Sequence, residues 1–321
     1  MKKAKKRLLT SSILITASTA AIYIINKMIN ASAVFKNLLS PQDNNFYEWR
    51  FGNIYYKKSG NGEPILLIHD LNVYSNDYEF SKLTHELEKN HTVYTIDLLG
   101  CGRSDKPKIT YTNFLYVQLI TDFVKNVINQ KTNVIVSGLS SSFVIMTCLN
   151  DNNVFEKIMM ISPEDLAVLN KTPTKQSKIA KFMLELPIIG TLLYHMIVCK
   201  PNVELLFTEK YLFNPFHTEQ SYIDTYYESA HKENSNGKYL QSSITGNYVY
   251  CNIAHALKEI NNSIFILSGE KTEGIQETTA LYKSLNSSIE SELIEKAKQM
   301  PHMENPKKVL EIIDIFFSYD S

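Results

Sequence analysis

The stretch that decides the fold is Val134-Ile135-Val136-Ser137-Gly138-Leu139-Ser140-Ser141-Ser142-Phe143. A run of β-branched residues ends in Gly-x-Ser-x-Ser and passes directly into an apolar segment with helical character. This order of strand, sharp turn and helix is typical of a nucleophile elbow, which needs small residues two positions from the central one. Gly138 and Ser142 are small, so the pattern predicts that Ser140 projects its hydroxyl above the sheet. A buried strand followed by a serine-rich turn fits the same residues.

Apolar runs and helical periodicities alternate on both sides of this stretch. Residues 46–51 and 54–58 read as two aromatic strands joined by a Gly-Asn turn, which predicts an N-terminal hairpin. Further strands are expected at residues 64–70, 93–96, 157–162, 263–268 and 292–294. Amphipathic helical patterns separate most of them, and this alternation predicts an α/β fold with a mostly parallel, doubly wound sheet.

The alternation stops between residues 163 and 260. This segment contains four proline breaks, many aromatic residues and no compelling buried strand, so we expect a mostly helical cap inserted into the fold. The predicted organisation is a basic flank and hydrophobic helix at 1–30, a linker at 31–45, a core formed by 46–162 and 261–321, and the cap at 163–260. No internal repeat is present in the sequence.

The amino terminus combines a basic flank with a long uncharged run from Leu8 to Asn26. The run is about as long as the roughly 18–20 residues needed to cross a bilayer. Three interpretations compete: an uncleaved membrane anchor, a signal peptide cleaved near Ala33 with secretion of the remainder, and a helix packed on the domain. For an anchor, the basic flank predicts a single-pass protein with a cytoplasmic amino terminus and the folded domain outside.

Composition argues against several classes of function. The 321 residues include 33 basic and 33 acidic side chains, so no net positive charge favours a nucleic-acid partner. The four cysteines are far apart and have no metal-ligand spacing with histidine, and they are expected to be free thiols. No phosphate-binding loop or dinucleotide motif occurs either, so we expect neither a metal nor a cofactor.

Five motifs in order resemble the α/β-hydrolase superfamily, in particular its capped esterase and peptidase-like branch. They are residues 66–70 (LLIHD), residues 97–107 (DLLGCGRSDKP), the elbow, residues 268–271 (SGEK) and residues 301–306 (PHMENP). The second motif is the closest match. The resemblance covers roughly residues 46–317 and implies a hydrolase fold with a degenerate catalytic triad.

By this resemblance Ser140 would be the nucleophile, and the backbone N–H groups of Leu71 and Ser141 would form the oxyanion hole. The positions of the usual acid and base are occupied by Thr272 and Gln299, neither of which can do that chemistry. His302 falls on a second, non-catalytic histidine of the family and is the candidate replacement base. Candidate replacement acids are Glu273, Glu164 and Asp165.

Two functions follow from these residues. The first is a membrane-anchored serine hydrolase acting on small apolar esters, thioesters or amides. The second is a catalytically silent protein of the same fold that binds a small apolar ligand or a protein partner through its capped pocket. A dehalogenase or epoxide hydrolase is less expected, because those relatives carry aspartate at the nucleophile position, where this sequence has Ser140.

Overall fold

The computed structural model describes residues 2–40 and 45–318; residues 41–44 of the predicted linker and the last three residues of the predicted core lie outside the described residues. The described chain forms a sheet of eight strands: β1 (Phe46–Trp49), β2 (Gly52–Ser59), β3 (Glu63–Ile68), β4 (His91–Ile96), β5 (Thr132–Ser137), β6 (Phe155–Ile161), β7 (Ser263–Gly269) and β8 (Glu290–Ile294). Their order across the sheet is β1-β2-β4-β3-β5-β6-β7-β8. The pairs β1–β2 and β2–β4 are antiparallel and the other pairs are parallel, which confirms the predicted sheet and its N-terminal hairpin.

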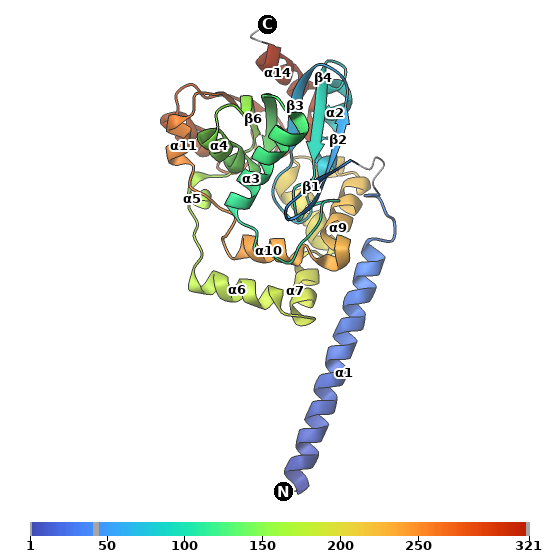
Figure 1. Ribbon diagram of the computed structural model, residues 1–321. Coiled ribbons are helices and arrows are strands. Elements are labelled where there is room, and N and C mark those ends of the chain that lie inside the picture. Colours follow the sequence, from blue (N-terminus) through green and yellow to red (C-terminus); the bar gives the residue numbers. More distant parts are fainter. Residues whose placement is uncertain (1, 41–44, 319–321) are drawn as a thin grey trace.

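Helices cover both faces of the sheet (Figure 1). One face carries α3 (Asn113–Phe123) with its π-helical extension η2 (Val124–Ile128), α4 (Ser140–Asn150), α11 (Ala254–Glu259) and α12 (Ile275–Leu285). The other face carries the 3-10 helix η1 (Asp77–Phe80), α2 (Ser81–Leu87), α13 (Pro301–Glu304) and α14 (Pro306–Ser318). Burial on both sides of the sheet explains why β3 is almost continuously apolar and why the centre of β5, Val134–Val136, is apolar as well.

The segment between β6 and β7 is helical throughout its regular elements, as the predicted cap requires. It contains α5 (Leu166–Leu169), α6 (Lys175–Glu185), α7 (Ile189–Ile197), α8 (Lys200–Leu205), the π-helical η3 (Leu206–Tyr211), the short η4 (Pro215–His217), α9 (Gln220–Ser235) and α10 (Lys238–Thr245). Its own apolar cluster of Phe207, Tyr211, Tyr222 and Tyr226 extends to Met300 and Met303 at the end of the core. The cap is therefore packed onto the loop that follows β8.

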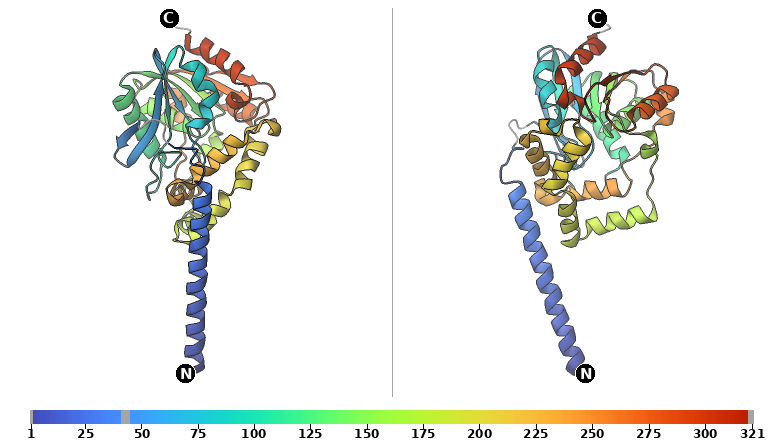
Figure 2. Two further views of the ribbon diagram at one scale, coloured as in Figure 1. Left: turned by 90° about the vertical axis from the view of Figure 1, so that its right-hand side faces the viewer. Right: turned by 180° about the vertical axis from the view of Figure 1, so that it is seen from behind.

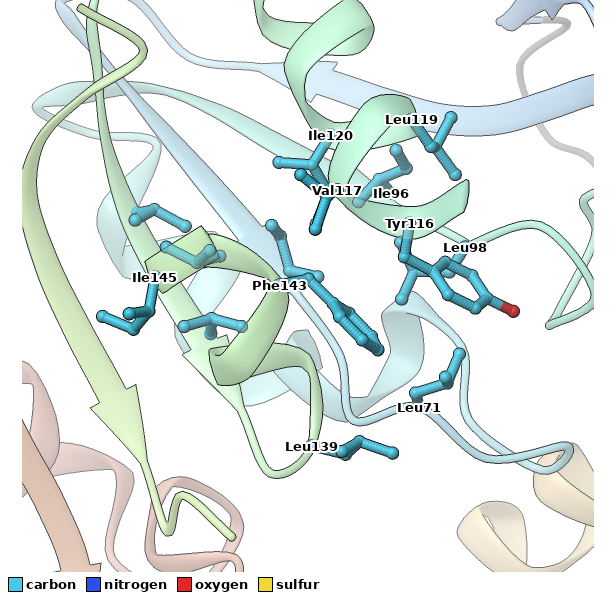
Figure 3. Packing of buried hydrophobic residues seen from close by; sticks show 14 of the residues in the cluster. Leu71, Ile96, Leu98, Tyr116, Val117, Leu119, Ile120, Leu139, Phe143 and Ile145 are labelled. Carbon is cyan, nitrogen blue, oxygen red and sulfur yellow. The ribbon is translucent and has the colours of Figure 1, made fainter. Parts of the chain in front are cut away.

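The helix after β5 is held in place by aromatic packing (Figure 3). Phe143 on α4 is fully buried and stacks on Tyr116 of α3, with ring centroids 5.1 Å apart. Burying such a side chain contributes roughly 1.5–3 kcal/mol. Leu71 and Leu139 belong to the same cluster and lie beside the turn into α4. The position of the elbow is thus set by the core below it.

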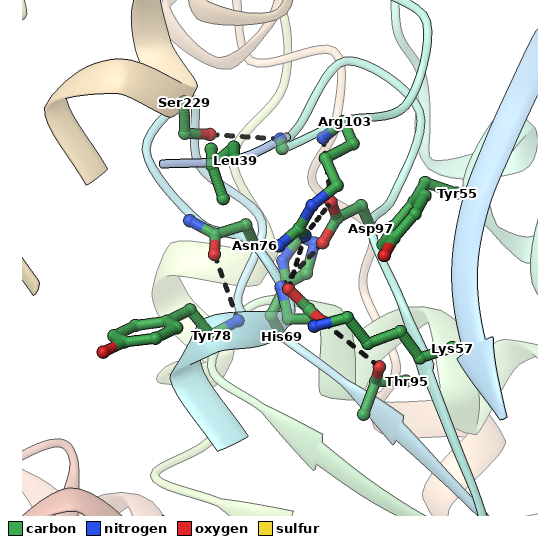
Figure 4. Close-up of polar contacts among 12 residues, drawn as sticks. Leu39, Tyr55, Lys57, His69, Asn76, Tyr78, Thr95, Asp97, Arg103 and Ser229 are labelled. Atoms are coloured by element: carbon green, nitrogen blue, oxygen red, sulfur yellow. Dashed lines mark hydrogen bonds and ion pairs between the residues drawn. The ribbon is translucent and has the colours of Figure 1, made fainter. Parts of the chain in front are cut away.

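A buried charge network joins β2, η1 and the loop after β4 (Figure 4). The Arg103 guanidinium lies 2.6 Å from Asp77 and 2.9 Å from Asp97, and Lys57 lies 2.7 Å from Asp77. Burial alone would raise the pKa of Asp77, but Arg103 and Lys57 outweigh it and lower that pKa. These charges compensate one another, as buried charges must.

The first helix, α1 (Lys2–Ala33), extends far beyond the rest of the molecule (Figures 1 and 2). Its segment Thr10–Ala33 is long and apolar enough to cross a membrane, and only 6% of the most apolar stretch is buried. The carboxyl-terminal part packs on the cap: the Asn26 amide donates to the carbonyl oxygen of Ile188, and Ser235 donates to Asn30. Length and composition agree with the predicted hydrophobic helix.

Candidate functional site: a filled elbow beside an open hollow

The turn between β5 and α4 is centred on Gly138, two residues before the predicted position. β5 ends at Ser137, α4 begins at Ser140, and Gly138 has φ +54°. In this motif the residue on the sharp, strained turn between strand and helix presents its side chain above the sheet. Leu139 is already helical, with φ −60° and ψ −32°. The residue that stands where a nucleophile would stand is therefore a glycine.

Ser140 does not project as the sequence pattern predicts. It lies in the first turn of α4, it is fully buried, and its hydroxyl donates to the carbonyl oxygen of His69 at 2.7 Å. The N–H of Ser141 is also used, since it donates to the carbonyl oxygen of Gly138 at 3.2 Å. The turn thus lies two residues earlier than the Gly-x-Ser-x-Ser pattern predicts. Ser140 is the small residue two positions after Gly138, while Val136 stands two positions before it.

Asp70 fills the space above the turn. A Cβ atom at Gly138 would lie 2.2 Å from Asp70 Oδ1. The same oxygen accepts the N–H of Leu139 at 2.8 Å, and this is the residue directly after the turn. In an elbow that position supplies an oxyanion donor. The carboxyl group of Asp70 thus occupies both the nucleophile's space and one donor of the oxyanion hole, while the predicted partner Leu71 has its side chain in the core.

His69 holds Asp70 in this position. Its Nε2 accepts the N–H of Leu98 at 3.0 Å, so Nδ1 carries the proton and donates to the carbonyl oxygen of Asp70 at 2.7 Å. Burial lowers the pKa of His69 below its usual value, which keeps the ring neutral. His69 is a structural link between the ends of β3 and β4.

His302 lies in a second buried cluster and does not contact Ser140. Its Nε2 is 3.6 Å from Glu79 Oε1, its ring stacks on Phe80, and neither ring nitrogen has a hydrogen-bond partner among the described residues. Burial lowers the pKa of His302 to about 3. Burial, with the nearby Asp70, raises the pKa of Glu79 to about 8. Both groups are therefore mainly neutral near pH 7, and the contact is not an ion pair.

An open hollow of about 580 Å³ lies next to the elbow, at the ends of β6, β7 and β8. Thr272 and Gln299, which occupy the usual acid and base positions, line it together. So do the three candidate acids Glu164, Asp165 and Glu273, whereas Ser140 and His302 do not. Burial, followed by the charge of Asp70, raises the pKa of Glu164. The wall also carries three lysines, Lys210, Lys271 and Lys298.

The two other candidate acids have different local roles. Asp165 caps α5 by accepting the N–H of Ala167, and its other oxygen accepts the hydroxyl of Thr278 at 3.3 Å. Glu273 lines the hollow beside Thr272. Within the described ranges, no group of three or more His, Cys, Asp or Glu side chains is arranged to hold a metal ion.

The cap is joined to the site by hydrogen bonds that the sequence did not reveal. Glu304 accepts the N–H groups of Phe213 and Asn214 through one oxygen and that of Lys298 through the other. On the opposite side, Asn72 donates both to Asp70 and to the Tyr211 hydroxyl. A chain of polar contacts therefore runs from the filled elbow into the cap. The contacts with Phe213, Asn214 and Tyr211 join residues far apart in sequence, and no local pattern could have indicated them.

No protein-family model matches the chain. It is similar to a proline iminopeptidase of Heyndrickxia coagulans, with 22% identity over 277 residues, 82% of this chain and 93% of that protein. Among solved structures, a serine hydrolase involved in carbazole degradation aligns with a TM-score of 0.71 and 14% identity over 86% of this chain and 98% of its own. An epoxide hydrolase without ligand aligns with the same TM-score of 0.71 and 18% identity over 85% and 98%. The sheet order, the capped topology and these likenesses show that the chain has the α/β-hydrolase fold.

Proposed function

We propose that this protein is a membrane-anchored member of the α/β-hydrolase fold that binds a small ligand and does not hydrolyse it. The observation that carries the proposal is the pairing of Gly138 with Asp70. Covalent catalysis needs a nucleophile in the elbow and free donors for the developing oxyanion. Here the elbow residue has no side chain, and Asp70 Oδ1 already accepts the N–H of Leu139.

The residues around the hollow support the same conclusion. A general base must accept a proton near neutral pH, which the amide of Gln299 cannot do. Thr272 cannot carry the negative charge that orients such a base. Because both residues line one hollow, the arrangement is that of the family's site without its chemistry. The imidazole of His302 is buried in a separate cluster, and both ring nitrogens of His69 are used by the backbone of Asp70 and Leu98.

The lining favours a small polar ligand that carries both charges, such as an amino acid or a short peptide. Carboxyl groups of Glu164, Asp165 and Glu273 lie across the same hollow as the lysines Lys210 and Lys271. A volume of about 580 Å³ falls within the range of small-molecule sites. This differs from the apolar ligand expected from the sequence. The likeness to a proline iminopeptidase adds support for a peptide-like ligand.

Hydrolysis by Ser140 is the competing proposal, and the fold shared with a serine hydrolase favours it. It requires the Ser140 hydroxyl to leave the carbonyl oxygen of His69 and reach a base from inside the first turn of α4. A fluorophosphonate probe separates the two proposals, because it labels an activated serine.

We expect no labelling of the full-length protein. The matched positive control is the combined variant Asp70→Gly, Gly138→Ser, Thr272→Asp and Gln299→His, which empties the oxyanion region and restores the three triad positions; we expect it to label. Labelling of the parent that disappears in Ser140→Ala would overturn the proposal. Ligand binding is tested by calorimetry with amino acids and dipeptides, comparing the parent with Lys271→Ala and with Lys258→Ala, which lies outside the hollow.

The proposed membrane anchor is helix α1. Contacts with the cap lie on both sides of the predicted cleavage position: Asn26 bonds Ile188 before Ala33, and the N–H groups of Leu38 and Leu39 donate to Glu228 after it. Cleavage near Ala33 would remove the first set, so these contacts favour a helix that stays attached. We propose that its amino terminus is cytoplasmic and the domain outside. Protease protection of the domain on intact cells would contradict this orientation.

A further inference from the structure

The cap helix α6 has its apolar side turned outward. Ile179 and Phe182 are 64% and 61% exposed, and Met183 is 41% exposed. The buried side contains Leu184 and also Lys181, which pairs with Glu185. A helix on the surface of a soluble domain normally buries its apolar stripe and exposes its charges. This reversal indicates that something apolar covers the outer side of α6.

The exposed apolar surface continues onto α7. Ile189 and Met196 are 50% and 63% exposed, and α6 meets the segment that begins with α7 at a bend of 106°. Both helices lie on the side of the molecule from which α1 extends (Figures 1 and 2). Exposed apolar residues gathered on neighbouring helices mark sites of interaction with a protein or a membrane.

The position of α1 identifies the occupant. The uncharged run from Leu8 to Ile25 contains 18 residues, so as a helix it is about 27 Å long, close to the roughly 30 Å of a bilayer's hydrocarbon core. Its outer end is next to Asn26, whose side chain bonds the carbonyl oxygen of Ile188 at 2.9 Å. Ile188 lies at the corner between α6 and α7. A bilayer spanned by this run therefore ends at the level of that corner.

We propose that α6 and α7 lie in the outer membrane–water interface, with the exposed apolar residues of α6 and α7 dipping into the bilayer that α1 spans. The occupant is the lipid itself. Lys175 and Lys178 are exposed in the first turns of α6, where their long side chains reach lipid phosphates. The cap is then held against the membrane at two places, which fixes its orientation. This inference rests on the proposed anchoring by α1, and the test below separates the two.

The test uses the full-length protein in vesicles of phosphatidylcholine and phosphatidylglycerol that contain a nitroxide on the acyl chain. Cys199 and Cys251 are replaced by serine, and an environment-sensitive fluorophore is attached at Ile179→Cys. The matched control is Ile315→Cys on α14, a similarly exposed isoleucine at 58% on the opposite end of the molecule (Figure 1). Leu14→Cys reports on insertion of α1.

We expect a blue-shifted emission at Ile179→Cys and at least about twofold more quenching than at Ile315→Cys, with strong quenching at Leu14→Cys. Equal, weak quenching at positions 179 and 315 with strong quenching at 14 would overturn the docking of α6 and leave the anchor intact. Weak quenching at 14 would overturn the anchor and the docking together. A blue shift at 179 without quenching would show that another protein chain covers α6, and would overturn the lipid assignment.

Discussion

The filled elbow predicts a specific energetic coupling between Gly138 and Asp70. In Gly138→Ala the alanine must adopt φ +54°, and its Cβ atom would lie 2.2 Å from Asp70 Oδ1. The left-handed conformation costs a non-glycine residue about 1 kcal/mol. Displacing Asp70 also breaks its hydrogen bond with Leu139, a bond to a carboxylate worth about 2 kcal/mol. The expected loss is therefore about 3 kcal/mol of unfolding free energy.

The assay is urea unfolding of a double-mutant cycle. In an Asp70→Gly background the clash is absent, so Gly138→Ala should cost only about 1 kcal/mol, leaving a coupling of about 2 kcal/mol. Gly274→Ala is the matched control, because Gly274 has a similar φ of +67° and nothing within 4 Å of the added Cβ. It should cost about 1 kcal/mol in either background. Additive costs at Gly138 and Asp70 would show that Asp70 does not fill the elbow.

Two further predictions concern buried charges. Folding raises the pKa of Glu79 from its ordinary value of 4.5 to about 8, so the folded protein keeps this carboxyl group protonated up to about pH 8. The stability that Glu79 contributes is therefore complete below pH 4.5 and is lost as the pH rises through 8. Glu79→Gln mimics the protonated form. As the pH rises from about 5 to about 8, the midpoint of urea unfolding should therefore fall less for this variant than for the parent. Parallel pH profiles of the two proteins would contradict a neutral Glu79. Arg103→Lys cannot span Asp77 and Asp97 and should cost about 3 kcal/mol in urea unfolding. The exposed Arg50→Lys should cost less than about 0.5 kcal/mol, and equal costs would refute the network.

The sheet and the cap could be predicted because their signals are local. Continuous apolar runs bounded by turn residues mark strands buried on both faces, and the proline-rich, strand-free segment marks the insertion. The pairing of Thr272 with Gln299 followed from motif order, and the structure brings both to one hollow. Each of these inferences needs only neighbouring residues or the order of motifs along the chain.

The register of the elbow could not be predicted in the same way. The requirement for small flanking residues favours a turn at Ser140, which has Gly138 and Ser142 two positions away, whereas a turn at Gly138 has Val136 and Ser140. The two placements differ in where β5 ends. That end is set by pairing with β6, where the N–H of Gly138 donates to the carbonyl oxygen of Ile161. It is also set by Asp70, whose carboxyl group needs the space above a glycine. Both contacts are distant in sequence.

The motif that resembled the family most closely turns out to stabilise the scaffold. Asp97, Arg103 and Ser104 bond one another, β2 and η1, and none of them lines the hollow. Gly102 is required there because a Cβ would lie 2.2 Å from Asp97. A chain can therefore keep this motif, and with it the fold, while the elbow and triad positions change freely. Resemblance carried by such residues is evidence of architecture. Evidence of chemistry must come from positions 70, 138, 272 and 299, and these four favour binding without hydrolysis.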